Sequence, residues 1–233
     1  MHTPFEKRII NLALFFLGYM VVFQVIVIFI LSLRYSMYEI LTTQLMTISL
    51  STGILTAALM TWVNSKVLKH DFRELKGKWF KVLKSASIYY IVILVTNIVL
   101  SVVLSYLAGS DSVANQELIE AEMLAAPIIT FITTVILAPF IEEFAFRYSL
   151  MNVTSKKKNV QILWWVISSA IFAMMHMVAS LESGNLNELW FFFQYFSMGL
   201  IMGHSYLSSK NIWVPITVHL LNNGIGVLLV FFA

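Results

Sequence analysis

Seven long runs of apolar residues alternate with short polar segments along this chain of 233 residues. Each run is close to the roughly 20 residues that an α-helix needs to cross the hydrocarbon core of a bilayer. We therefore expect an all-α protein, a polytopic transmembrane helix bundle that forms a single integral membrane domain over residues 1–233. The predicted spans are Ile9–Leu33, Leu41–Val63, Ile88–Leu107, Ala125–Leu150, Gln161–Leu181, Trp190–Leu207 and Ile212–Ala233.

The composition supports a membrane protein. Of the residues, 59% are hydrophobic and only 12% are charged, whereas a soluble domain carries about 25% charged residues. The lipid bilayer is accordingly an expected partner, and nucleic acid is not. The chain has no cysteine, which excludes a thiol nucleophile, a thiolate metal site and a disulfide framework.

The basic residues predict the orientation of the bundle. Of the 15 lysines and arginines, 13 lie before the first span or in alternate loops, and the exceptions are Arg34 and Arg147. The positive-inside rule then places the N-terminus in the cytoplasm and the C-terminus outside. The most basic loop, Lys66–Lys84, has apolar residues at three- and four-residue spacing, which predicts a basic amphipathic helix on the anionic membrane surface. The alternative for this loop is a solvated segment without a helix.

Two adjacent glutamates in the fourth span stand out, because each charge at the centre of a membrane helix costs about 2.5–3.5 kcal/mol. Arg147 lies four residues after Glu143, so the two can form an ion pair one helical turn apart. Glu142 points about 100° away and has no partner in its own span. A buried ion pair that only joins helices would explain Glu143 and Arg147 but not Glu142. Pro139 is expected to bend this helix just before the acids.

Polar residues also occur in two later spans, His176 in the fifth and His219, Asn222 and Asn223 in the seventh. Ionisable residues inside a membrane are expected to face one another or a cavity. A carboxylate, imidazoles and an amide can activate water and stabilise an oxyanion. The same side chains can equally bind a divalent metal such as zinc, with Glu142, His176 and His219 as candidate ligands. His204, near the end of the sixth span, is interpreted as structural or interfacial.

Three motifs on successive helices resemble the CAAX protease and bacteriocin-processing family, also called the Abi family of intramembrane proteases. The similarity covers about residues 125–226. The motifs are Glu-Glu-x-x-x-Arg, Phe-x-x-x-His and His-x-x-x-Asn, which correspond here to Glu142, Glu143, Arg147, Phe172, His176, His219 and Asn223.

The resemblance implies an intramembrane endopeptidase that cleaves a membrane-associated peptide or protein. Glu142 would activate the attacking water with His176 beside it, and His219 and Asn223 would hold the oxyanion or the other side of the water. Glu143 and Arg147 would support the site. The family has been described both as metal-dependent and as a metal-free glutamate protease. The short loops favour a bacterial member, located in the cytoplasmic membrane.

Two other functions are consistent with the same residues. A bacteriocin-immunity or scaffolding protein could use the polar cavity to bind a partner without catalysis. An ion carrier could use Glu142, although the other spans lack a second acid for a relay.

Overall fold

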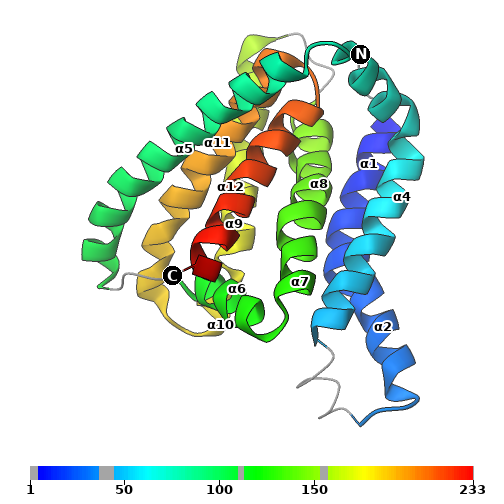
Figure 1. The fold of residues 1–233 in the computed structure, drawn as a ribbon, viewed down its shortest axis with the longest axis vertical. Coiled ribbons are helices and arrows are strands. Elements are labelled where there is room, and N and C mark those ends of the chain that lie inside the picture. Colours follow the sequence, from blue (N-terminus) through cyan, green and yellow to red (C-terminus); the bar gives the residue numbers. More distant parts are fainter. Residues whose placement is uncertain (1–4, 37–44, 110–112, 153–156, 233) are drawn as a thin grey trace.

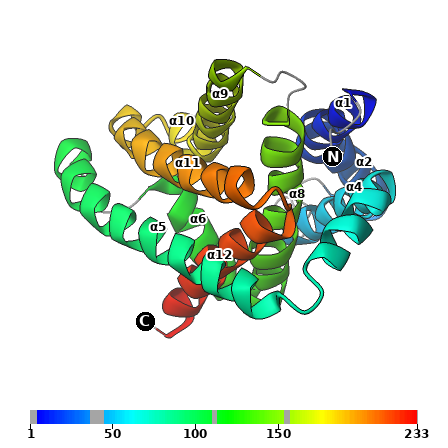
Figure 2. The ribbon, with the colours of Figure 1, turned by 90° about the horizontal axis from the view of Figure 1, so that it is seen from above.

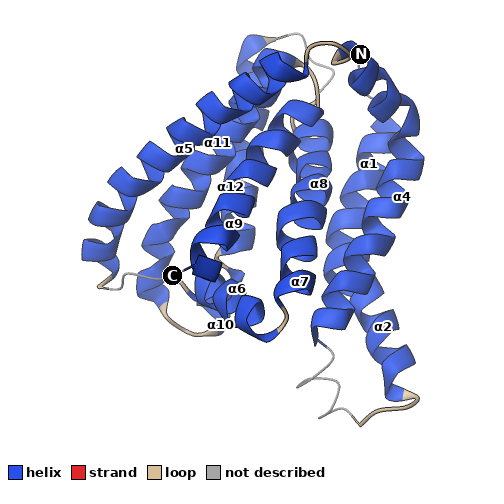
Figure 3. Ribbon diagram, viewed as in Figure 1, coloured by secondary structure: helices blue, strands red, loops and turns tan. Residues whose placement is uncertain are grey.

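The computed structural model describes residues 5–36, 45–109, 113–152 and 157–232. These residues form helices joined by short turns and contain no strand (Figure 3). The first half of the chain forms α1 (Phe5–Ala13), η1 (Leu14–Val22), α2 (Phe23–Ser32), α4 (Leu45–Glu74), α5 (Trp79–Ala108) and α6 (Ala114–Ala125). The second half forms α7 (Pro127–Thr130), η3 (Phe131–Leu137), α8 (Ala138–Glu143), η4 (Phe144–Leu150), α9 (Lys158–His176), α10 (Val178–Glu182), η5 (Leu186–Phe191), α11 (Phe192–Ser209) and α12 (Trp213–Phe232).

Helices occupy all seven positions where spans were predicted, and the protein is an integral membrane protein. Within the described ranges, six helices are long and apolar enough to cross a bilayer: Phe5–Ser32, Met46–Glu74, Trp79–Ala108, Pro127–Leu150, Lys158–His176 and Trp213–Val230. The sixth predicted span, Trp190–Leu207, corresponds to α11, which has 18 residues and is more polar.

The fourth span, from α7 to η4, stands in the middle of the molecule. It lies between α1 and α4 on one side and α9 and α12 on the other, as the view from above shows (Figure 2). Because the two glutamates sit on this central element, Glu143 is fully buried between helices from both halves of the chain, whereas Glu142 is half-buried. The beginning of α1 and the end of α12 lie at opposite ends of the bundle (Figure 1).

Small residues bring α9 and α11 together, and this is the most extensive helix pair in the molecule. A Cβ atom placed on Gly199 would lie 3.0 Å from the Cα atom of Ser169, and one on Gly203 would lie 2.6 Å from the Trp165 ring. Glycines four residues apart let helix backbones approach closely within a membrane. This contact fixes the position of the α9 end that carries His176.

The predicted amphipathic helix over Lys66–Lys84 is wrong. The helix α4 continues without a break to Glu74, and a turn through Gly77, at φ +77°, leads directly into α5. Leu75 and Val82 are buried against Val214 of α12, so part of the apolar pattern reflects packing within the protein. The sequence analysis also missed α6, which lies between the third and fourth predicted spans.

The backbone of the central span is irregular on both sides of the acids. Wide π-type turns run through η3 and η4, and the N–H of Ala138 donates to the carbonyl of Thr133, five residues back. The segment η3 ends at Leu137, two residues before Pro139, whose ring nitrogen has no hydrogen to donate. Such π segments inside helices are frequently found at functional sites.

Candidate active site

A polar cavity of about 170 Å³ lies inside the bundle, between α5, α6, α11 and α12 and the end of α9. It contains four of the polar residues that the sequence analysis selected, and these come from two separate spans. The residues that line it are Asn97, Asn115, Gln116, Ile119, Thr134, His176, Gln194, Tyr195, Met198, His219, Asn222 and Asn223.

The predicted pair of Glu143 and Arg147 is confirmed. The Nε atom of Arg147 lies 3.1 Å from Oε2 of Glu143, and both side chains are fully buried. The guanidinium carbon of Arg147 also lies 4.9 Å from the centre of the Phe172 ring, a favourable cation–π distance. Phe172, the first residue of the second motif, thus contacts the last residue of the first motif.

His219 completes a buried triad with this pair. Its Nδ1 atom lies 3.0 Å from Oε1 of Glu143. With Arg147 against its other oxygen, Glu143 is a carboxylate and can only accept hydrogen bonds. Nδ1 of His219 therefore donates this hydrogen bond, and in the neutral ring the Nε2 lone pair is left to act on a molecule in the cavity.

His176 has the same tautomer for a different reason. Its Nδ1 atom lies 2.9 Å from the carbonyl oxygen of Phe172, and a carbonyl can only accept. The His176 ring stacks on Tyr195, with 4.6 Å between the ring centres and 27° between the planes. Both histidines thus have one fixed nitrogen and one Nε2 lone pair available in the cavity.

Polar contacts fix the N-terminal end of α12. The N–H of Ile212 donates to Oδ2 of Asp71 at 3.0 Å, and the N–H of Trp213 donates to Oδ1 of Asn211. An acid and an amide are the residue types that stabilise a helix N-terminus. His219 lies six residues after Trp213, so these contacts set its height in the bundle.

The amides of α12 form a short chain. Asn222 donates to Oδ1 of Asn223 at 3.1 Å, and Asn223 donates to the carbonyl of Thr134 at 2.9 Å. One N–H of Asn223 is therefore used within the protein. Its second N–H is the one that a substrate could use.

Glu142 is separate from these contacts. Its Oε2 atom is buried and has no hydrogen-bond partner among the described residues, and Glu142 does not line the cavity. It is within electrostatic range of His176, Arg147 and Tyr19. His204, interpreted as structural or interfacial, lies outside the cavity and contacts the hydroxyl of Tyr89 at 2.9 Å.

Several cavity residues were missed by the sequence analysis. Asn97 is an amide inside the third span, a signal that the sequence offered. Gln194 and Tyr195 lie at the start of α11, and Asn115 and Gln116 belong to the unpredicted α6. These four residues could be assigned to the cavity only once the positions of the helices relative to one another were known.

The α6 helix is attached beside the cavity by Glu188. This carboxylate accepts hydrogen bonds from the N–H of Ala114 at 2.9 Å, the hydroxyl of Ser180 at 2.6 Å and the amide of Asn185 at 2.8 Å. Burial by itself would raise the pKa of Glu188, but these three hydrogen bonds together hold its pKa below the ordinary value.

The described residues fit the predicted metal site only in part. Histidines whose Nδ1 donates to a carboxylate or a carbonyl are typical metal ligands. However, no group of three His, Asp or Glu side chains within the described ranges is arranged to hold an ion. Glu142, His176 and His219 are therefore not assembled as a ligand set, and we derive no step through a metal.

Comparisons with known proteins agree with the motifs. A family model described as Type II CAAX prenyl endopeptidase Rce1-like matches residues 124–225. The chain is 29% identical to the membrane-embedded CAAX protease MroQ of Staphylococcus aureus over 203 residues, which cover 84% of this chain and 77% of MroQ. No solved structure matches the chain.

Two further relatives match over shorter parts. YdiL of Bacillus subtilis is 28% identical over 115 residues, 49% of this chain and 42% of YdiL. The UPF0177 protein YvdC of Lactococcus lactis is 25% identical over 156 residues, 67% of this chain and 56% of YvdC. The family match covers all three motifs, and the site described above is built from them. Over the region that holds the three motifs, the chain is therefore similar to the CAAX protease and bacteriocin-processing family of membrane proteases.

Proposed function

We propose that the protein is an intramembrane endopeptidase that hydrolyses a peptide bond of a membrane-associated peptide or protein. One observation carries this proposal. Two histidines from different spans face one polar cavity with their Nε2 lone pairs available, beside a buried Glu143–Arg147 pair. A hydrogen-bonded carboxylate that orients an imidazole is the arrangement used to activate nucleophiles in hydrolases.

Glu142 does not line the cavity but lies within electrostatic range of His176. In the proposed reaction, a water molecule at the edge of the cavity, between Glu142 and the two histidines, gives its proton to Glu142. The water oxygen attacks the scissile carbonyl carbon, and the second amide N–H of Asn223 stabilises the resulting oxyanion. The intermediate collapses as the carbon–nitrogen bond breaks. Glu142 then returns the proton to the leaving amine, so that the residue acts first as a base and then as an acid.

Two cavity residues support a peptide as the substrate. Oδ1 of Asn97 and Oε1 of Gln194 are buried and have no hydrogen-bond partner within the described part of the chain. Buried acceptors are normally paired, either with protein or with water. Backbone N–H groups of an extended peptide would supply the donors that these two oxygens need.

The charge distribution supports an orientation for the protein in a bacterial cytoplasmic membrane. The α4–α5 turn, the start of α9 and the α11–α12 turn lie at the same end of the bundle as the start of α1 (Figure 1). Lysines and arginines concentrate in these segments. This end would face the cytoplasm, with the C-terminus outside.

The test uses purified protein in detergent, with cleavage of membrane-associated peptides and bound zinc measured on the same sample. Glu142→Gln and His176→Gln should abolish cleavage while the protein stays folded. Glu182→Gln and His204→Gln change the same residue types outside the cavity and should cleave normally. Normal cleavage by both site variants would overturn the proposal. About one zinc per chain, lost in the inactive variants, would add a metal to the mechanism.

A further inference from the structure

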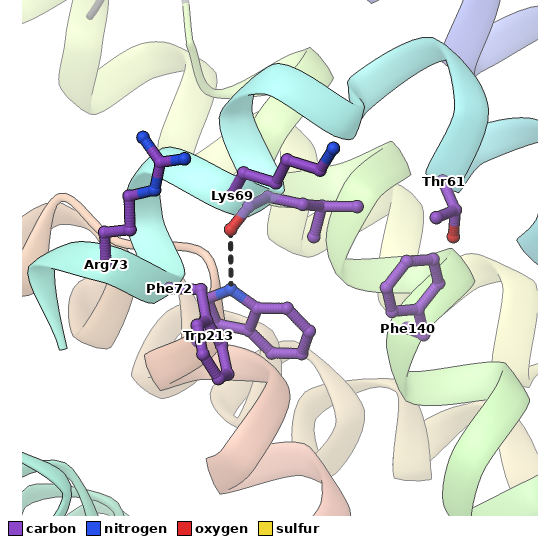
Figure 4. A pocket seen from close by; sticks show the side chains of 7 residues that line it. Thr61, Lys69, Phe72, Arg73, Phe140 and Trp213 are labelled. Atoms are coloured by element: carbon purple, nitrogen blue, oxygen red, sulfur yellow. Dashed lines mark hydrogen bonds between the residues drawn. The ribbon is translucent and has the colours of Figure 1, made fainter. Parts of the chain in front are cut away.

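A second pocket, of about 340 Å³, lies near the α4–α5 turn and is separate from the polar cavity. Its walls are almost entirely apolar, and they come from α4, α8 and α12 (Figure 4). None of its residues belongs to the three family motifs. The residues that line it are Thr61, Leu68, Lys69, Phe72, Arg73, Phe140 and Trp213.

The rim of this pocket is positively charged. Lys69 and Arg73 are exposed and lie four residues apart, on one face of α4. Figure 4 shows their charged ends on one side of the pocket and the rings of Phe72 and Trp213 on the other. Neither cation has an ion-pair partner among the described residues. The nearby acid Asp71 accepts a hydrogen bond from the N–H of Ile212 instead.

The apolar part extends from this rim into the span. Thr61 precedes Lys69 by eight residues, which corresponds to about 12 Å along the helix. Phe140 and the Trp213 ring line the same space, and Nε1 of Trp213 donates to the carbonyl of Leu68 at 3.4 Å. The polar edge of the indole is thereby satisfied within the protein. Tryptophan is the residue that typically marks the membrane–water interface.

We propose that this pocket binds an anionic phospholipid of the surrounding bilayer. The phosphate contacts Lys69 and Arg73, and one acyl chain lies against Phe72, Phe140 and Trp213. Basic pockets between membrane helices are suited to anionic head groups. Lys69 and Arg73 should each attract the lipid phosphate as a basic residue at an anionic membrane surface does. The volume is at the lower end for ligand pockets, which suits one lipid chain. This site does not depend on the proposed peptidase activity.

The experiment measures binding of phosphatidylglycerol with brominated acyl chains to the delipidated full-length protein in detergent. Bromine quenches tryptophan fluorescence at short range, and the chain has six tryptophans. The quenching that belongs to the pocket is therefore the part that disappears in Trp213→Phe. Wild type should show saturable quenching that phosphatidylcholine with the same brominated chains does not reproduce. Lys69→Gln with Arg73→Gln should weaken this binding about 30-fold, given the attraction expected for two cations.

Two further variants make the test specific. Lys81→Gln with Lys84→Gln removes the same charge from the same end of the molecule, outside the pocket, and should leave the saturable binding intact. Thr61→Phe narrows the end of the pocket away from the charged rim without changing the charge or adding a tryptophan, and should weaken the lipid binding. Equal binding of both lipids would overturn the proposal, and so would equal losses in the two charge-removing variants.

Discussion

Glu143 on α8 and His219 on α12 are joined by a hydrogen bond of 3.0 Å between Oε1 and Nδ1 inside the bundle. Glu143 uses its other oxygen for Arg147. One carboxylate thus neutralises a buried guanidinium and also fixes the tautomer of a histidine from another span. The acid that the sequence presents as half of an ion pair is therefore also the residue that orients His219.

Replacing Glu143 should strongly destabilise the protein. Glu143→Gln leaves the fully buried Arg147 without its counter-charge, which typically costs about 3–5 kcal/mol. Thermal unfolding in detergent should show a large loss of stability, compared with little change for the exposed Glu182→Gln. The double variant Glu143→Met with Arg147→Met should recover much of the stability but stay inactive, because His219 loses its orienting partner. A Glu143→Gln protein as stable as wild type would contradict this role for the pair.

The attachment of α6 by Glu188 should depend on pH. The folded-state pKa of Glu188 lies below its ordinary value of 4.5 because of its three hydrogen bonds. Its contribution to stability is therefore fully present above pH 4.5 and is lost as the pH falls through the lower folded value. Hydrogen bonds to a charged group contribute about 1.5–3 kcal/mol, so Glu188→Gln should unfold more easily near neutral pH.

The melting temperatures of wild type and Glu188→Gln should converge as the solution is acidified below the folded pKa. Glu182→Gln changes an exposed acid at the end of α10 and serves as the control. A difference between wild type and Glu188→Gln that stayed constant across this range would show that the carboxylate charge is not what holds α6.

The sequence predicted those features of the site that depend on spacing within one helix. The separation of Glu143 and Arg147 by one turn was sufficient to predict their contact. The rotation of α12 relative to α8 is not encoded in any such spacing, so the partner of His219 could not be assigned. The sequence also did not show how deep in the bundle each histidine lies. His176 lies 18 residues from the start of α9 and His219 only six from the start of α12, yet both line one cavity.

Two errors along the chain have physical causes. The Lys66–Lys84 pattern has the period of an amphipathic helix, but Gly77 allows a left-handed turn that ends one long helix and begins another. The α6 helix was missed because 12 residues with several acids are too short and too polar for a span. In both segments some of the apolar residues pack against the protein itself. Leu75 and Met123 are examples, because both are buried.

The close contact of α9 with α11 predicts a large effect of a small substitution. Gly199→Ala adds a methyl group 3.0 Å from the Ser169 backbone, so the helices must separate, and such overpacking typically costs about 1–3 kcal/mol. Gly226→Ala is the matched control, because nothing lies within 4 Å of its added carbon. It should be neutral or slightly stabilising, since alanine favours helices. Thermal unfolding that ranked the two variants equally would contradict this packing.

Tyr195 should act as a positioning residue for His176. Its ring stacks on the imidazole, and its hydroxyl accepts a 3.3 Å hydrogen bond from Asn115. Tyr195→Leu removes the stacking surface, and a misplaced catalytic group can cost about 100-fold in rate, so kcat should fall strongly with little change in KM. Tyr195→Phe keeps the ring and should retain most of the activity. Equal losses in both variants would instead assign the function to the hydroxyl, as a donor to the substrate, and would contradict a role through stacking.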